Sequence, residues 1–296
     1  MAGKRLTRQE VVNAIKEGVL RTGGDVVAIV LFGSFARGGE YRDIDLLVVV
    51  ESLDKAPLDR KDEVQAIRQG IGLALPVEVL LFSKEECADG FRAHLPLFLD
   101  IAFEGLLLHD DGFVGQLMEE TRRYVETQGI RRTETGGWRF PVAYRQATVL
   151  STLKNHDWAQ MWLSDAGQDL AAAASLFEDG IFDKCVTHCQ QVAEKAVKSV
   201  LACFGILEKT HYVSGTLEKE LESQNVPDWA DRLKELTVHA RDLEPDATLS
   251  RYPGMYEGKV WLPHREYDEV KAQEALEKAR CALDIATAFT QWWFAR

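Results

Sequence analysis

The pattern of hydrophobic and polar positions divides this 296-residue chain into two parts. Up to about residue 128, short apolar runs alternate with stretches in which apolar residues recur every three or four positions. These are the patterns of strands and of amphipathic helices. From residue 157 onward only the helical period remains. The pattern therefore predicts an α+β domain at residues 1–128 and an all-α helical bundle at residues 157–296.

Strands and helices of the first part can be placed from the same pattern. The runs at residues 26–32 and 46–50 are rich in β-branched residues and too short for buried helices, so we expect core strands there. Residues 77–82 predict another strand and 106–109 a short final one. Helices are expected at residues 59–73 and about 113–126. Two capping boxes, Thr7 with Glu10 and Ser83 with Glu86, predict further helix starts, the first helix ending at Gly23-Gly24.

One face of the first predicted helix is apolar, comprising Val11, Val12, Ile15, Val19 and Leu20. In the bundle, helices are predicted at about residues 158–179, 183–204, 213–224, 228–241 and 265–292. The helix at 183–204 has Asp183 as its predicted N-cap and carries the longest apolar stripe: Cys185, Cys189, Val192, Ala193, Ala196, Val197, Val200, Leu201 and Phe204. Residues 244–264 contain three prolines and predict a long, functional loop.

Composition narrows the class of protein. The longest apolar run, Val26–Phe32, is far shorter than a membrane span, and the N-terminal residues lack the apolar segment of a signal peptide. Five scattered cysteines argue against a disulfide framework and fit a reducing compartment. We therefore expect a cytoplasmic protein without membrane association. A net charge of −12 argues against bulk attraction to nucleic acid.

The charge is unevenly distributed, which indicates a boundary. Residues 1–128 carry a net charge of −7 and residues 157–296 one of −9, whereas residues 129–156 carry +4. The basic stretch also contains Gly136-Gly137, and we interpret it as a linker. Its arginines and lysine could join two acidic domains electrostatically, or they could bind a triphosphate or RNA.

The stretch with the clearest chemistry is residues 26–50. Gly33-Ser34 follows an apolar strand, where small residues let the backbone approach a phosphate. Asp43 and Asp45 open the next strand, and since side chains alternate along a strand, both point the same way. Two carboxylates held this close repel each other unless a cation lies between them, and Mg²⁺ prefers such ligands. The pattern predicts metal-assisted transfer from a nucleoside triphosphate.

FGSFARG followed by DIDLLVVV resembles the minimal nucleotidyltransferase domains of the polymerase-β-like superfamily. The resemblance implies transfer of AMP from ATP, with Gly33 and Ser34 on the triphosphate and Asp43 and Asp45 on Mg²⁺. It also implies a third carboxylate on a later strand, for which Glu78 is the candidate, as metal ligand or catalytic base. Arg37 is the candidate for a further triphosphate contact. The eight residues between Ser34 and Asp43 depart from the family, which more often has about ten.

The second part resembles the HEPN domains. The resemblance rests on CQQVAEKAVKSVL at 189–201, on KTH at Lys209–His211 and on RYPG at Arg251–Gly254. A nucleotidyltransferase joined to such a bundle resembles the antitoxin–toxin pairs in which the transferase AMPylates the toxin. It is also similar to the aminoglycoside nucleotidyltransferases, whose bundle completes the substrate site. The resemblance implies a homodimer and favours a protein tyrosine as acceptor, ahead of a small molecule or an RNA end.

Two other functions remain open at this point. HEPN ribonucleases carry an Arg and a His separated by four to six residues, and Arg232 and His239 match with six between them. Two helical turns place both on one face, where they could act on a phosphodiester. Alternatively, the first domain is a non-catalytic nucleotide-binding module and the bundle an interaction module.

Other polar residues of the bundle have simpler interpretations. Cys185, His188 and Cys189 have the spacing of metal ligands on a helix, but both cysteines lie in the apolar stripe, which favours packing. Lys195 and Lys198 alternate with Glu194 and predict a solvated surface. His211 is interpreted as a helix-start residue. Arg251 and Tyr252 are interpreted as loop anchors, with a modifiable tyrosine as the alternative.

Overall fold

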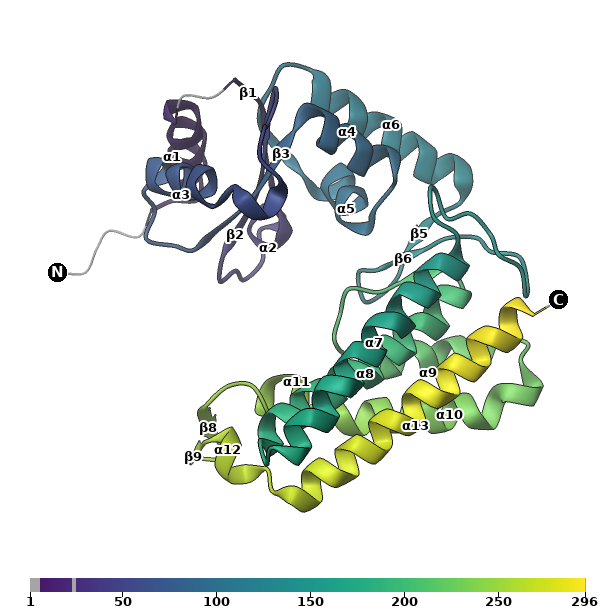
Figure 1. Cartoon of the computed structure of the whole chain (residues 1–296). Coiled ribbons are helices and arrows are strands. Elements are labelled where there is room, and N and C mark those ends of the chain that lie inside the picture. The colour runs from purple at the N-terminus through teal and green to yellow at the C-terminus, as the bar shows by residue number, and fades with distance from the viewer. Residues whose placement is uncertain (1–5, 23–24, 296) are drawn as a thin grey trace. The chain divides into compact units, whose positions relative to one another are not determined.

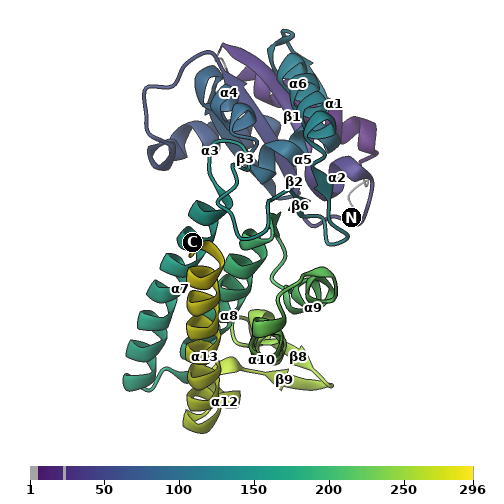
Figure 2. The same cartoon turned by 90° about the vertical axis from the view of Figure 1, so that its right-hand side faces the viewer.

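The computed structural model describes residues 6–22 and 25–295 and consists of two units. The N-terminal unit ends at Gln128 and the C-terminal unit begins at Gly129. The first contains a sheet covered by helices and the second is mostly helical (Figure 1, Figure 2). Both predicted fold classes are therefore confirmed. None of the helices in these residues is both long enough and apolar enough to cross a membrane.

The N-terminal unit is built around a four-stranded sheet with the order β3-β2-β1-β4. Its elements are α1 (Arg8–Arg21), β1 (Val26–Phe32), α2 (Gly33–Arg37), β2 (Ile44–Val50), a 3₁₀ turn (Pro57–Asp59), α3 (Lys61–Ile71), β3 (Val77–Ser83), α4 (Lys84–Arg92), α5 (Pro96–Glu104), β4 (Leu106–Asp110) and α6 (Phe113–Gln128). Strand β1 is antiparallel to β2 and β4, whereas β2 and β3 are parallel.

Helices cover both faces of this sheet (Figure 1). Along β2, Leu46 and Val48 pack with α1 and α3, while Leu47 and Val49 pack with α4, α5 and α6. Because both faces are buried, the central strands are continuous apolar runs rather than alternating ones. Strand β2 is thereby fixed from both sides, and the polar residues at its beginning have a rigid support.

Most of the helix starts and ends predicted for this unit are found in the structure. Thr7 with Glu10 and Ser83 with Glu86 each form a complete capping box, which confirms both predicted helix starts. Helix α1 ends at Arg21, and the predicted end at Gly23-Gly24 lies outside the described residues. The prediction that Leu20 belongs to the apolar face is wrong: Leu20 is exposed, because the buried stripe runs through Val11, Ile15, Gly18 and Val19.

The second capping box continues into a buried ion pair. Glu86 accepts two hydrogen bonds from the Arg60 guanidinium, at 2.9 Å and 2.7 Å, and Arg60 is almost fully buried. The guanidinium also donates to the backbone oxygens of Lys55 and Leu81, at 2.8 Å and 3.0 Å. Arg60 therefore ties the loop after β2 to the end of β3 and the start of α4. Its hydrogen bonds hold the pKa of Glu86 below the usual value.

We expect Arg60→Gln to destabilise the N-terminal unit by about 2 kcal/mol, less than a fully buried pair because Glu86 is one-third exposed. A lowered carboxylate pKa contributes stability above the ordinary Glu pKa and loses it as pH falls toward the lowered value. Between pH 7 and pH 3, the unfolding temperature of the variant should therefore fall by less than that of the wild type. Arg92→Gln, which removes an exposed pair with Asp89, is the control and should change little. Equal acid profiles for wild type and Arg60→Gln would contradict this role.

The C-terminal unit is organised around one central helix. Its elements are β5 (Arg131–Arg132), β6 (Trp138–Arg139), α7 (Asn155–Glu178), α8 (Phe182–Cys203), β7 (Ile206–Leu207), α9 (Ser214–Ser223), a 3₁₀ turn (Pro227–Trp229), α10 (Ala230–Leu243), α11 (Asp246–Leu249), β8 (Gly254–Tyr256), β9 (Lys259–Trp261), α12 (Pro263–Glu266) and α13 (Glu269–Phe294). Helix α8 packs against α7, α10 and α13. Every residue of its predicted apolar stripe is buried, which confirms the stripe.

Two local predictions about the bundle are wrong. Asp183 does not cap α8: the helix begins one residue earlier, after Ile181, so Asp183 lies within the first turn. Residues 244–264 are not one irregular loop, since they contain α11, the hairpin β8–β9 and the start of α12. Turn-forming prolines and glycines obscured these short elements, each of which spans four residues or fewer.

Residues 129–156 pack onto the bundle. Strand β6 pairs with β5 and with β7, which directly follows α8. Arg139 forms an ion pair with Glu220 of α9, and the Arg145 guanidinium lies 4.2 Å from the Trp292 ring centre and donates to the Trp292 carbonyl. At least two of the basic side chains of this segment are therefore engaged inside the C-terminal unit.

Candidate active site

The candidate site begins where β1 ends. Phe32 is the last residue of β1, and α2 starts at once with Gly33, so the predicted Gly-Ser turn is in fact one turn of helix. The first N–H groups of a helix have no partner within it and are free to bind an anion. Gly33 and Ser34 supply two of them and are both half-buried.

Three carboxylates approach this turn from the neighbouring strands. Asp45 lies opposite Phe32 in the antiparallel β1–β2 pair and beside Glu78 in the parallel β2–β3 pair. Asp43 precedes β2 by one residue and lies close enough to Asp45 for its charge to raise the pKa of that carboxyl. This face of β2 continues with Leu47, which packs toward α4–α6. The sheet register therefore places Asp45 and Glu78 on one face, with Asp43 adjoining at the start of β2.

The electrostatics of Asp45 show that these groups interact. Burial raises the pKa of Asp45, and repulsion from Asp43 and then from Glu78 raises it further, while Arg37 lowers it. The charges of Asp43, Glu78 and Arg37 therefore all lie close enough to Asp45 to change its pKa. Arg37 is exposed and forms an ion pair with Glu104 of α5, so its guanidinium already has a carboxylate partner.

This donor set fits a hard divalent cation. Clustered carboxylates that repel one another are relieved by a cation between them, and oxygen is the ligand atom that Mg²⁺ prefers. Asp43 and Asp45 are the pair best placed to hold it. Within residues 6–22 and 25–295, no group of three or more Asp, Glu, His or Cys side chains is arranged so that it could hold a metal ion, Asp43, Asp45 and Glu78 included.

Gly33 makes the close approach of Asp45 possible. A Cβ atom at this position would lie 1.8 Å from Asp45 Oδ2, and the φ of Gly33 is +73°, in the region that favours glycine. The Asp45 carboxylate therefore occupies the space that any side chain at position 33 would need. Sequence reasoning identified both residues but not their contact.

A cavity of about 1010 Å³ is lined by Leu6, Val11 and residues of the loops 38–42 and 73–75, and none of Asp43, Asp45 and Glu78 lines it. Tyr41 and Arg42, which lead directly to Asp43, line one side, and Leu73 and Leu75, which lead toward Glu78, line another. The Tyr41 ring packs edge-on against Phe35 of α2, with centroids 4.7 Å apart. Sequence analysis did not find this cavity, because its lining comes from three segments that are distant along the chain: residues 6–11, 38–42 and 73–75.

In the C-terminal unit, Arg232 and His239 both lie on α10, as the ribonuclease hypothesis requires. Arg232 is exposed and lies 5.8 Å from the Trp229 ring centre. His239 is half-buried, and its Nε2 is 3.7 Å from Glu235. Among the contacts of the described residues, none joins Arg232 to His239. Their joint role stays a prediction.

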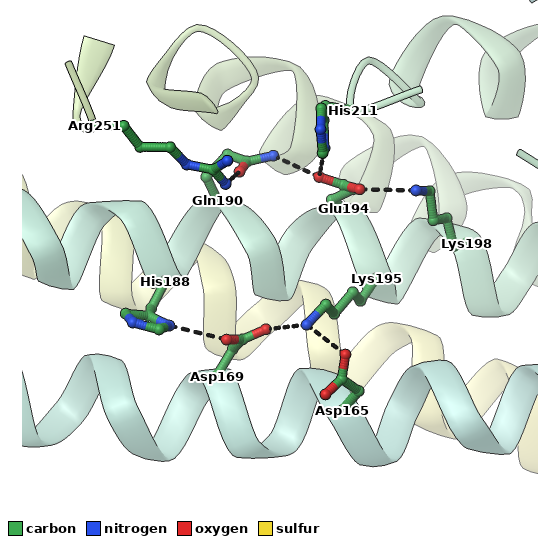
Figure 3. A network of polar contacts seen from close by, with 9 residues as sticks. All are labelled: Asp165, Asp169, His188, Gln190, Glu194, Lys195, Lys198, His211 and Arg251. Carbon is green, nitrogen blue, oxygen red and sulfur yellow. Dashed lines mark hydrogen bonds and ion pairs between the residues drawn. The ribbon is translucent and has the colours of Figure 1, made fainter. Parts of the chain in front are cut away.

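The polar face of α8 is not solvated, contrary to the sequence prediction (Figure 3). Lys198 is only 7% exposed and donates to Glu194 at 2.8 Å, while Lys195 is 16% exposed and pairs with Asp165 and Asp169 of α7. His188 also bonds Asp169, at 2.9 Å. Helix α7 and two loops cover this face, so the charges are paired with one another instead of with water.

For the other polar residues of the bundle, the contacts and exposure decide between the interpretations made from the sequence. Cys185 and Cys189 are buried with sulfurs 4.0 Å apart, while His188 turns to Asp169, so the packing interpretation of the cysteines is the right one. His211 does not begin a helix: α9 starts at Ser214, and the His211 ring bonds Glu194 at 2.9 Å. Tyr252 is exposed and is not a packed anchor.

Comparison with known proteins matches each unit to a family. Residues 12–109 match the family described as a nucleotidyltransferase domain, and residues 159–289 match the one described as a HEPN domain. A Methanocaldococcus jannaschii protein described as a candidate toxin, MJ1304, is 33% identical over 136 residues, which are 46% of this chain and 90% of that protein.

Two further proteins are similar over shorter or more distant matches. MJ1305 of the same organism, described as a candidate protein adenylyltransferase, is 52% identical over 40 residues, covering 13% of this chain and 27% of that protein. The crystal structure of ST0689, an archaeal HEPN homologue, is 30% identical with a TM-score of 0.34, and the match covers 45% of this chain and 97% of that one.

Proposed function

The chain belongs to the HEPN domain family and joins its HEPN domain to an N-terminal nucleotidyltransferase domain, and from this premise we propose that it transfers AMP from ATP to a hydroxyl group. The observation that carries the proposal is the position of Asp45, which lies opposite Phe32 at the first turn of α2 and beside Glu78, with Asp43 close enough to raise its pKa. Carboxylates grouped in this way destabilise the folded protein as long as no cation lies between them, and the same grouping suits the binding of a metal-bound triphosphate.

Each residue has a defined task in the proposed reaction. The backbone N–H groups of Gly33 and Ser34 bind the β- and γ-phosphates, and Arg37 adds a charge at their edge. Asp43 and Asp45 would hold Mg²⁺, with Glu78 as the adjoining third carboxylate. A bound Mg²⁺ ion supplies charge neutralisation of the phosphates and polarises the phosphorus that is attacked.

The chemical step is a substitution at the α-phosphorus. The acceptor oxygen forms a bond to this atom, the bond to the oxygen that bridges to the β-phosphate breaks, and pyrophosphate leaves. The acceptor's proton passes to the Glu78 carboxylate and then to solvent. Glu78 is exposed at the start of β3, which suits a base that exchanges protons with water.

A protein tyrosine is the acceptor that we propose. The similarity to a protein described as a protein adenylyltransferase supports a protein acceptor. The C-terminal unit itself offers four exposed tyrosines, Tyr144, Tyr212, Tyr252 and Tyr256. Tyr144 donates its hydroxyl hydrogen to the Asn225 carbonyl, which makes the other three the better nucleophiles.

The test is incubation with α-³²P-labelled ATP and Mg²⁺, with and without cell extract. We expect label on a protein, at tyrosine, from the wild type and from Asp54→Asn, an exposed acid outside the site. The double variant Asp43→Ala/Asp45→Ala should give none. ATP binding without label transfer or pyrophosphate release would overturn the proposal and favour a nucleotide-binding module.

A further inference from the structure

The N-terminal unit contains a second cavity, of about 290 Å³, which we call the α1–α3 cavity. Helices α1 and α3 lie side by side on one face of the sheet (Figure 1). The apolar part of the lining comes from both helices, from three strands and from the chain after β2: Val19, Val26, Val48, Val50, Leu53, Ala66, Ile67 and Leu81. Since a cavity of about 150 Å³ holds benzene, this one has room for a phenyl ring with a short side chain.

The α1–α3 cavity is separate from the candidate active site. Strand β2 carries Asp45 near its beginning and lines the cavity with its last residue, Val50. The two residues are about 17 Å apart, at roughly 3.4 Å per strand residue. Strand β1 likewise starts at the cavity with Val26 and ends at Phe32, directly before α2. A molecule bound in this cavity is therefore neither the nucleotide nor the acceptor of the proposed transfer.

The charged side chains that line the α1–α3 cavity are all acidic. They are Asp25, Glu51 and Glu63, and no lysine, arginine or histidine of the described part of the chain lines the cavity. Glu51 forms an ion pair with Lys84 at 3.2 Å, and Lys84 is not part of the lining. The charge at the cavity therefore favours a cation over an anion.

Glu63 provides a specific contact for such a cation. Its Oε1 atom forms an ion pair with Lys55 at 2.7 Å, whereas its Oε2 atom is buried and has no hydrogen-bond partner within the described residues. The hydrogen bond from Lys55 lowers the pKa of Glu63, so the carboxylate is charged at neutral pH. A buried oxygen without a donor is unfavourable, and a ligand that carries an N–H group would supply one.

The walls of the α1–α3 cavity are held in place without a ligand. Gly18 and Gly70 allow α1 and α3 to approach closely: a Cβ atom on Gly18 would lie 2.4 Å from the Ile71 Cα. The Arg21 guanidinium of α1 also donates to the Gly70 carbonyl of α3, at 3.3 Å. Because the two helices are fixed to each other beside the cavity, binding does not require the walls to be ordered first.

We propose that the α1–α3 cavity binds a small apolar molecule that carries one ammonium group. The apolar part of the molecule packs among the valine, leucine and isoleucine side chains. The ammonium group donates a hydrogen bond to Glu63 Oε2, and the charges of Asp25 and Glu51 add to the attraction. The proposal does not depend on AMP transfer, because the cavity includes none of the residues assigned to that reaction.

The experiment is calorimetric titration of the full chain with 2-phenylethylamine, 2-phenylethanol and 3-phenylpropanoate. These three probes have similar apolar parts and carry a positive charge, no charge and a negative charge. The amine is expected to bind at least tenfold more tightly than the alcohol and to raise the unfolding temperature of the protein. The acid is expected not to bind. Failure of the amine to bind, or equal binding of amine and acid, would overturn the proposal.

Three variants test where the amine binds. Glu63→Gln keeps the shape of the side chain and removes its charge, so it should weaken binding of the amine at least tenfold and leave binding of the alcohol unchanged. Ala66→Leu adds volume to the lining at an exposed helix position and should abolish binding of both. Asp62→Asn removes an exposed acid of α3 outside the lining and should bind as the wild type does.

Thermal unfolding without any probe shows whether each variant is folded. Folded Glu63→Gln that binds the amine as tightly as the wild type would show that Glu63 does not contact the ammonium group, and the proposal would be wrong. Folded Ala66→Leu that still binds the amine would place the amine outside the α1–α3 cavity, with the same consequence.

Discussion

Asp45→Asn is expected to lower AMP transfer on the order of a thousandfold while raising the unfolding temperature of the protein without Mg²⁺. The loss of activity follows from removing a charge that would hold the metal. The gain in stability follows from the raised pKa of Asp45, whose causes are burial and then repulsion from Asp43 and Glu78. An acid with a raised pKa lowers stability above its ordinary pKa, and this cost disappears as pH falls below that value. The stability gain should therefore be present at pH 7 and absent near pH 3.

Three measurements check this expectation. Thermal unfolding without Mg²⁺ should place Asp45→Asn above the wild type at pH 7, and added Mg²⁺ should stabilise the wild type but not the variant. AMP transfer is the third. The control Asp54→Asn removes an exposed acid from the same unit and should match the wild type in all three respects. A variant that is both inactive and less stable at pH 7 would show that Asp45 has a structural role instead of belonging to a metal site.

The sequence reveals the acidic pair because its geometry is local. Alternation along a strand predicts that Asp43 and Asp45 face the same way, although β2 itself begins only at Ile44. The position of Glu78 depends on topology instead: it lies beside Asp45 because β3 runs parallel to β2 in a particular register. A single sequence does not specify that register, so family resemblance can suggest Glu78, whereas strand periodicity alone cannot place it beside Asp45.

The polar face of α8 departs from its prediction for a different reason. Charged residues opposite an apolar stripe normally face water, and Lys195 and Lys198 fit that pattern. The structure covers this face with α7 and with the loops that carry His211 and Arg251. Those loops are remote in sequence, and each adds a single partner. Periodicity describes one helix at a time and contains no information about such coverage.

Gly33→Ala is expected to lower transfer at least a hundredfold, because the new Cβ would lie 1.8 Å from Asp45 Oδ2 and would displace either the turn or the carboxylate. The substitution also requires alanine at a φ of +73°, which costs about 1–2 kcal/mol in any protein. Stability alone therefore does not distinguish a damaged site from a strained backbone.

Gly72→Ala separates the two effects. Gly72 has a φ of +63°, and its nearest contact for a Cβ is the Gln69 carbonyl oxygen at 3.7 Å, an ordinary distance. This variant should lose a similar amount of stability in thermal unfolding and keep its AMP transfer, since it is the C-cap of α3 and touches none of the carboxylates. Comparable activity in Gly33→Ala and Gly72→Ala would mean that the contact between the turn and Asp45 is not needed for transfer. A selective loss in Gly33→Ala would tie the reaction to the fit between the first turn of α2 and the acid on β2.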